Sequence, residues 1–334
     1  MRRALTIVLP CLLLAVLIGG HTAAWFAASR YLGTGFDAWV AQRRAAGWQV
    51  AAGTPVRGGW PLAATLTVPD LTLEAGPEGA PGRVSWHAGL VVLSLAATSP
   101  DRLGIDLAGA QSLRIAPGPE VGFSADRLHV EVTLARAAPA RTVGLEVRGL
   151  RAQGMAMGLL TGQVVAGEAV TLTLSAEAID LPPEMNWAFG PHISSVAVDA
   201  TVRGGLPPPG ALPAMAEAWR DADGVVDVTH MALGWGPLGV AATGQGRLDE
   251  HLQPAGTADL HVIGYTKALE ALAGQHVISK DAARAATAVL TLLSRAPQDG
   301  GAPEVQVPLV LKDRMVLMGK TPLVRVPDVV WPHE

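Results

Sequence analysis

The densest cluster of side chains that could do chemistry lies in the segment GQGRLDEHLQPAGTADLHVIGY, residues 244–265. It holds Asp249, Glu250, His251, Asp259 and His261 within thirteen residues. Carboxylates and imidazoles are the groups that bind divalent metals or transfer protons. A metal site needs three or four ligands that converge on one point. Adjacent residues such as Glu250 and His251 diverge in a turn, so we favour a turn between two strands over a metal or acid–base site.

The residues on either side of this turn alternate with a period of two. Apolar residues or glycines occupy every second position from 238 to 248, and again from 258 to 262, with polar residues between them near the turn. Such alternation predicts two half-buried strands whose charged side chains lie on the solvent face. Arg247 and Asp259 are then placed to pair across the two strands.

Other motifs with a catalytic or ligand-binding precedent are incomplete. The GKT at 319–321 lacks the first glycine of a phosphate-binding loop, because Arg314 stands at that position. Zinc-protease, serine-hydrolase and calcium-loop motifs do not occur in the sequence. We therefore assign no catalytic, cofactor-binding or metal-ligating residue, and expect neither a cofactor nor an enzyme.

Composition limits the partners that the chain can have. Its 25 Lys and Arg against 29 Asp and Glu give a net charge of −4, so the basic surface that nucleic-acid binding requires is missing. A single cysteine, Cys11, excludes a disulfide framework. The 38 glycines and 25 prolines follow no fixed period, which indicates turns between many short strands.

The N-terminus predicts a membrane anchor. After Arg2 and Arg3, residues 4–29 carry no formal charge apart from His21. A helix of that length spans about 39 Å, more than the ~30 Å of a bilayer's hydrocarbon core. We interpret residues 1–32 as a signal anchor that crosses the inner membrane once through residues 4–29 and leaves the body in the periplasm. The alternative is a cleaved signal peptide and a secreted body.

Beyond the anchor the pattern is that of a β protein. FDAWVAQRRAAGW, residues 36–48, predicts a short amphipathic helix, after which strands recur every 8–15 residues with Gly and Pro turns between them. The predicted fold class is mainly β: one N-terminal transmembrane helix followed by an elongated, twisted, mostly antiparallel sheet with two or three short packed helices. We expect β-rich halves at 33–205 and 206–334, which could also form one continuous domain, with helices near 211–220 and 279–294 in the second half.

Four stretches of the sequence resemble an uncharacterised bacterial envelope family, domain-of-unknown-function family 2125. They are AWVAQRRAAGWQV, VRGGWPLAATLTVPDLTLE, VSWHAGLVVLSLAATSPDRLGIDL and LVLKDRMVLMGKTPLVRVP. The matching positions, which the resemblance implies to be structural, are Trp39, Arg43, Gly47, Gly59, Trp60, Pro61, Trp86, Gly319 and Pro322. The chain departs from the family pattern at Trp60, where Phe is expected, and at residues 312–314, where Lys-Asp-Arg replaces a turn glycine.

The resemblance implies a location and an architecture but no activity, so three classes of function stay open. More distantly, the chain is similar in style to AsmA-like envelope proteins, whose long curved sheets cradle lipid chains. The first class is therefore a protein that binds a lipid or another apolar ligand in a curved sheet groove, unless the helices at 212–219 and 279–294 fill that face. The second is a structural or interaction protein with an envelope protein partner, to which the Pro-rich loop 204–213 could contribute. The third is a hydrolase-type enzyme, in which His192 pairs with Asp180 or Glu184.

Overall fold

The computed structural model describes residues 2–76, 83–134, 141–205, 212–295 and 303–331, with side chains from Leu12 onward. In this described part of the chain, the strands form a large antiparallel sheet of 17 strands, accompanied by one N-terminal apolar helix and three further short helices. The predicted fold class is confirmed. The chain divides into two compact units: residues 1–136 with 145–153, and residues 137–144 with 154–334.

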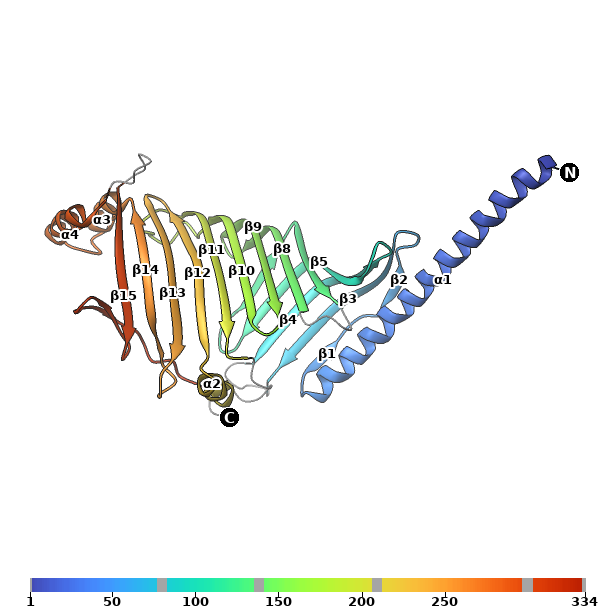
Figure 1. The fold of residues 1–334 in the computed structure, drawn as a ribbon, viewed down its shortest axis with the longest axis horizontal. Helices are drawn as coiled ribbons and strands as arrows, with labels where there is room; N and C mark the ends of the chain where they lie inside the picture. The colour runs from blue at the N-terminus through green and yellow to red at the C-terminus, as the bar shows by residue number, and fades with distance from the viewer. Residues whose placement is uncertain (1, 77–82, 135–140, 206–211, 296–302, 332–334) are drawn as a thin grey trace. The chain divides into compact units, whose positions relative to one another are not determined.

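The first unit combines one long helix with an antiparallel sheet (Figure 1). Its elements are α1 (Arg2–Ala45), β1 (Gln49–Ala51), β2 (Val56–Gly58), β3 (Ala63–Ala75), β4 (Val84–Ala96), β5 (Ser99–Ile115), β6 (Glu120–Ser124), β7 (Arg127–Thr133) and the end of β8 (Arg141–Ala152). Strand β3 pairs with β1, β2 and β4, and β4 continues to β5. Strand β5 is long enough to pair with β6 at one end and β7 at the other.

The core of the first unit lies between α1 and the sheet. Leu66 and Val68 of β3 are among the most buried side chains, and Leu32 of α1 packs in the same cluster. The alternation of buried residues along β3 changes phase after Val68, because Asp70 adopts a left-handed φ of 49°. Leu71 is buried as a result.

The second unit is a meander in which each strand pairs antiparallel with the next (Figure 1). Its strands are β9 (Met155–Ala166), β10 (Val170–Asp180), β11 (His192–Arg203), β12 (Val225–Trp235), β13 (Leu238–Leu248), β14 (Pro254–Ile263), β15 (Glu304–Lys312), β16 (Met315–Met318) and β17 (Thr321–Arg325). Its helices are α2 (Leu212–Asp221), α3 (Tyr265–Gly274) and α4 (Lys280–Leu293). Ser279 caps α4 by accepting a hydrogen bond from the Ala282 amide, as its type predicts.

Three features differ from the sequence-based expectation. The anchor and the short helix expected at 36–48 are one unbroken helix, α1, which ends only where Gly47 turns the chain at φ 82°. Helix α3 was not expected; it follows β14 directly through Gly264, whose φ is 72°. Arg247 and Asp259 are not opposite one another, since Arg247 pairs with Ala255 and Asp259 with Thr243, so the predicted ion pair does not form.

The division of the chain also lies elsewhere than between residues 205 and 206. Strands β11 and β12, on either side of the Pro-rich loop, pair along their length within the second unit. Gly204 and Gly224 approach so closely that a Cβ on Gly204 would lie 2.6 Å from Gly224 Cα. The loop residues 206–211 themselves lie outside the described residues. The change of unit falls instead around β8, which contributes to both.

Candidate functional site

The second unit presents a broad apolar sheet face. Across β9 to β15 the registered residues on one face are apolar in one row after another: Leu160, Ala176, Val196, Leu233, Val240, Val262 and Val305 in the first row. The next row is Gly162, Leu174, Val198, Met231, Ala242, Leu260 and Val307. Most of these side chains keep part of their surface exposed. An apolar face of this extent is what a ligand or partner would cover.

The helices of this unit lie at the ends and margin of the sheet and not over that face. Arg220 of α2 donates a hydrogen bond to the carbonyl of Glu250, at the β13–β14 turn. Helix α3 begins at the opposite end of β13, where Gly264 lies against the carbonyl of Pro237. Helix α4 packs on α3 and on β15 (Figure 1). Among the described residues, therefore, the helices proposed as covers leave the apolar face of β9–β12 uncovered.

The first unit has a matching apolar face, and α1 covers one side of it. Ala64 of β3, Leu95 of β4, Leu103 of β5 and Val132 of β7 are registered neighbours. Helix α1 packs on β1, β3 and β4 with Trp25, Ala28, Leu32, Phe36, Trp39 and Val40. Helix α1 packs on β1 to β4 but not along β5 and β7, so the cover is incomplete.

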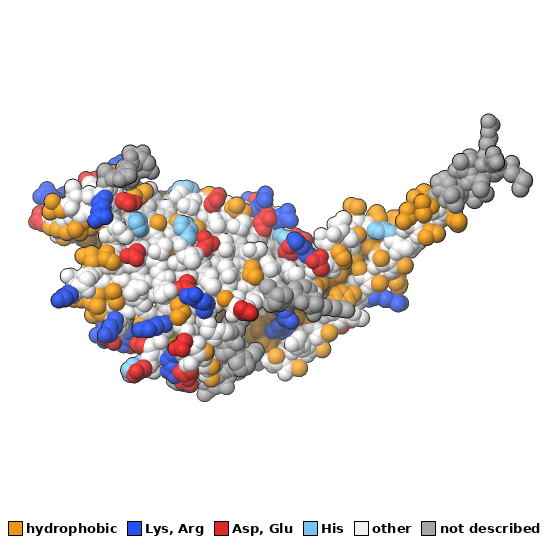
Figure 2. All heavy atoms as spheres, viewed as in Figure 1, with side chains coloured by type: hydrophobic (Ala, Val, Ile, Leu, Met, Phe, Trp, Pro, Cys, Tyr) orange, Lys and Arg blue, Asp and Glu red, His pale blue; other side chains and the backbone are white. Residues whose placement is uncertain are grey.

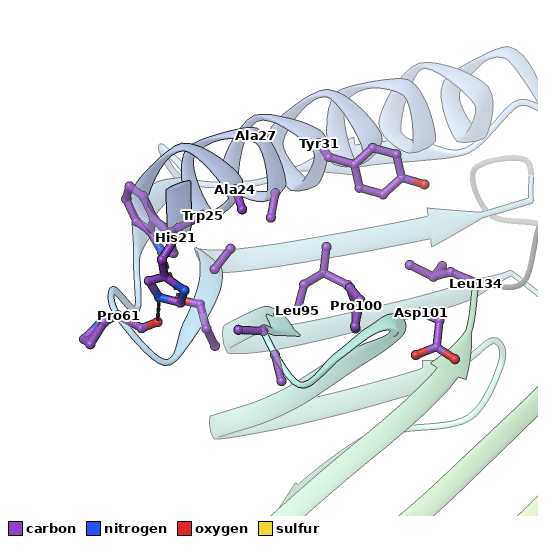
Figure 3. Close-up of a pocket in the computed structure, with 15 residues that line it drawn as sticks. His21, Ala24, Trp25, Ala27, Tyr31, Pro61, Leu95, Pro100, Asp101 and Leu134 are labelled. Atoms are coloured by element: carbon purple, nitrogen blue, oxygen red, sulfur yellow. Dashed lines mark hydrogen bonds between the residues drawn. The ribbon is translucent and has the colours of Figure 1, made fainter. Parts of the chain in front are cut away.

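A pocket opens where α1 leaves the sheet. Its volume is about 810 Å³, within the ~300–1,000 Å³ usual for small-molecule sites. Figure 3 shows α1 on one side, and the ends of β4 and β5 with Leu134 on the other. The lining residues are His21, Ala24, Trp25, Ala27, Ala28, Tyr31, Pro61, Ala63, Ala64, Leu95, Ala96, Ala97, Pro100, Asp101 and Leu134.

The pocket exists because its walls are made of small residues. Seven of the fifteen lining residues are alanines, and they come from α1, from the start of β3 and from the β4–β5 turn. Helix–sheet interfaces are normally filled by Leu, Ile or Phe at the density of a crystal. The alanine methyl groups leave the space between the helix and the sheet unfilled at this end. The result is a cavity that an apolar ligand would fill.

Few polar groups line this pocket. His21 and Asp101 are its ionisable side chains, and Tyr31 adds a phenol hydroxyl (Figure 3). The indole nitrogen of Trp25 is already satisfied, since it donates to the carbonyl of Ala63 at 3.0 Å. His21 Nε2 lies 2.6 Å from the carbonyl oxygen of Pro61. An apolar interior with a few polar groups at its margin suits a hydrocarbon chain that carries a polar head.

Beyond the pocket, α1 is apolar and exposed. Leu12, Leu13, Leu14, Val16, Leu17 and Ile18 are each 51–64% exposed. Figure 2 shows hydrophobic side chains around this part of the helix. The helix is long and apolar enough to cross a membrane by its length and composition. The described side chains from Leu12 to Ile18 therefore have the character of a bilayer-spanning segment.

The polar cluster that opened the sequence analysis lies in a turn and on an outer face. Asp249 accepts hydrogen bonds from the amides of His251 and Gln253, each at 2.8 Å, and so closes the β13–β14 turn. His261 lies on β14, 3.7 Å from Glu304 of β15. The predicted turn between two strands is confirmed.

His192 and Asp180 do come together, at 2.8 Å, as paired residues of β10 and β11. Both are more than half exposed. His129 and Asp106 make a similar contact of 2.7 Å between β5 and β7 in the first unit. The recurrence of this contact across neighbouring strands is typical of cross-strand pairing on a solvated face.

The family-signature residues occupy turns and helix packing. Trp39 stacks on Phe36, and the Arg43 guanidinium lies 6.0 Å from the Trp39 ring and 5.7 Å from the Trp48 ring. Gly59 has a φ of 90°, and a Cβ there would lie 2.5 Å from the carbonyl oxygen of Ala63. The remaining signature positions lie in the β2–β3 turn (Trp60, Pro61), in β4 (Trp86), in the β16–β17 turn (Gly319) and in β17 (Pro322).

At the second departure from the family pattern, Asp313 and Arg314 form the β15–β16 turn with φ values of 51° and 63°. These are the left-handed conformations for which glycine is usual. Asp313 and Arg314 thus adopt the backbone conformation that a glycine would have there, and the turn forms without the glycine.

The chain belongs to the family described as uncharacterized protein conserved in bacteria (DUF2125), whose profile matches residues 25–327. Searches of curated proteins and of solved structures gave no match. The matched range includes the second half of α1, the β2–β3 turn and the pocket-lining residues from Trp25 onward.

Proposed function

We propose that the protein is a membrane-anchored binding protein, without catalytic activity, that holds the hydrocarbon chain of a lipid in the pocket between α1 and β3–β5. The observation that carries this proposal is the pocket itself, an open apolar cleft of about 810 Å³ beside a helix with the character of a membrane span. Each buried methylene contributes about 0.8 kcal/mol, so a chain of several methylenes gains appreciable affinity.

In this proposal α1 crosses the inner membrane once and leaves the body in the periplasm. Arg2 and Arg3 favour the cytoplasmic side. About 20 helical residues suffice for the hydrocarbon core, which takes the span from Ala4 to Ala23. The packing of Trp25 and Leu32 on the sheet counts against cleavage beyond Trp25, because a cut there would remove part of the core.

The apolar face of β9–β15 supports the same chemistry on a larger surface. Side chains such as Val240 and Leu260 are only partly buried, and in water an exposed apolar sheet face of this size carries a free-energy cost. We propose that hydrocarbon chains also lie along this face.

Lipid retention by pocket-filling variants tests the proposal. Full-length protein would be extracted in mild detergent, purified, and examined by native mass spectrometry with lipid extraction. The variant A24L/A27L fills the pocket, whereas A38L adds the same group to an exposed position of α1 outside it. We expect bound lipid on the parent and on A38L, and its loss from A24L/A27L. A parent that emerges empty, or an A24L/A27L protein that keeps the same lipid, contradicts the proposal.

A second candidate function, an interaction protein of the cell envelope, is favoured by one observation. Val289, Leu292 and Leu293 of α4 are 54%, 87% and 52% exposed and lie at i, i+3 and i+4, so they form one apolar stripe. A photo-crosslinking residue at Leu292, compared with one at the exposed Arg284 of the same helix, tests this alternative in cells. A discrete protein adduct at 292 and not at 284 supports it, and equal labelling at both positions counts against it.

A further inference from the structure

We infer that the β2–β3 turn, residues Gly59–Leu62, enters the membrane beside α1 at the level where hydrocarbon gives way to headgroups. The partner of this turn is the lipid bilayer. The inference rests on the proposed membrane span of α1 and adds a second membrane contact, made by the body itself. Residues 59–62 are called the Trp60 turn below.

Two hydrogen bonds fix the level of the Trp60 turn along α1. His21 lies 2.6 Å from the carbonyl oxygen of Pro61, and Trp25 donates to the carbonyl of Ala63 at 3.0 Å. His21 and Trp25 are one helical turn apart, so the two bonds hold the strand end parallel to the helix. A span that starts at Ala4 reaches the far side of the ~30 Å hydrocarbon core about 20 residues later, near these two residues.

The side chains of the turn are those that suit this depth. Trp60 is 53% exposed and Leu62 is 82% exposed, although neither has a polar role in the fold. Tryptophan concentrates at membrane–water interfaces, because its ring is apolar and its N–H can reach a polar partner. Leu62 is among the most exposed large apolar side chains described. Two exposed apolar residues on either side of Pro61, in the same turn, are an arrangement that a bilayer would stabilise.

The charged residue nearest to the turn in β2, Arg57, lies on the side of the turn that faces away from the proposed membrane. Along β2 the chain runs from Arg57 towards Trp60, and the Arg57 guanidinium lies against Gly33 of α1, where a Cβ would be 2.8 Å from it. Gly33 is twelve residues beyond His21, or about 18 Å along the helix axis. The cation therefore lies well outside the proposed hydrocarbon boundary, while Trp60 and Leu62 lie at it. The apolar residues of the turn are thus nearest to the hydrocarbon, and the cation is on the aqueous side, as expected at a membrane interface.

This placement deepens the proposed function, because Pro61 of the turn and its hydrogen-bond partner His21 of α1 both line the pocket. The pocket then borders the interface directly. A hydrocarbon chain can pass from the bilayer into the pocket without crossing water.

Site-specific labelling of full-length protein in phosphatidylcholine–phosphatidylglycerol vesicles tests the inference. In a C11A background, the environment-sensitive fluorophore NBD is attached at L62C, with I115C as the matched control. Ile115 is also apolar and 55% exposed, but it pairs with Val84, at the other end of β4 from Ala96, about 40 Å away. A third label at L17C reports on α1 itself, where Leu17 is 60% exposed.

We expect NBD at 62 to emit at shorter wavelength than NBD at 115, and to be quenched by lipids spin-labelled near the glycerol backbone. NBD at 17 should be quenched by lipids labelled deeper in the acyl chain. If the label at 17 is quenched by lipid but the label at 62 gives the same emission and quenching as the label at 115, the inference is wrong and the membrane anchor is retained. If 17 also behaves like 115, the anchor and with it the proposed function fail. A label at W60C repeats the test should L62C alter the fold.

Discussion

His21 and Pro61 are 40 residues apart in the chain and are joined by one hydrogen bond, from the imidazole Nε2 to the backbone carbonyl, at 2.6 Å. A carbonyl oxygen can only accept, so the imidazole donates. This bond connects the helix at the end of its exposed apolar segment to the first turn of the sheet. It lies at the edge of the pocket, and it sets how deep the Trp60 turn lies along α1.

Replacement of His21 by leucine should release the Trp60 turn without unfolding the first unit. The lost hydrogen bond is worth about 1 kcal/mol, while Trp25 and Leu32 still hold α1 on the sheet. Hydrogen–deuterium exchange should therefore rise in residues 59–63 and stay unchanged in the middle of β3. T22V is the control, because the Thr22 hydroxyl bonds only to Ile18 within the helix among the described residues. Equal protection of residues 59–63 in H21L and T22V would show that the bond does not hold the turn.

Two glycines of the N-terminal region should respond to alanine in opposite directions. Gly47 ends α1 at φ 82°, a conformation that costs an L-residue about 1–2 kcal/mol, so G47A should lower the free energy of unfolding by that amount. Gly35 lies inside α1, and a Cβ there meets nothing within 4 Å. G35A should raise the free energy of unfolding by about 0.5–1 kcal/mol. Urea denaturation of the detergent-solubilised protein measures both, and a shift of the same sign in the two variants would refute this explanation.

The covered and uncovered parts of the apolar surface should differ in their sensitivity to truncation. Leu66 is 2% exposed beneath α1, so L66A should cost about 2–5 kcal/mol of stability. Leu260 lies on the partly exposed face of β14, and L260A in delipidated protein should cost about 1 kcal/mol or less, since little surface returns to water. Urea denaturation compares the two. A loss at Leu260 as large as that at Leu66 would mean that the face of β9–β15 is filled.

Much of the fold could be predicted, because apolar residues recur along the sequence with the period of the strand or helix that they form. The alternation on both sides of Asp249 predicted β13, β14 and the turn between them, and Ser279 predicted the start of α4. The exposed stripe on α4 could not be predicted: the sequence offers the helix at 279–294 as a cover of the sheet face, but Ala283 is its buried residue and Val289 and Leu293 are exposed. The spacing of apolar residues shows which side of a helix is apolar, but it does not show which element, if any, packs against that side.

The candidate site could not be predicted, because its residues lie in separate parts of the chain. His21 and Tyr31 belong to a helix that composition marks only as an anchor, and Pro100 and Leu134 belong to strand ends. The signal that could have indicated a cavity is the set of alanines at 24, 27 and 28, at helical spacing beside the aromatic Trp25. Small residues on the packing side of a helix indicate either close approach or empty space, and only the structure distinguishes the two.

Helix α1 is continuous from Arg2 to Ala45, so the proposed anchor and the first unit are joined by a rigid helix and not by a flexible linker. A flexible linker would let the body sweep a volume of the surrounding space at random. A continuous helix that continues into the core of the first unit instead carries the tilt of the span directly into the sheet. With the anchor in a bilayer as proposed, the first unit keeps a fixed orientation to the membrane, so the same residues of its sheet face the lipid surface at all times.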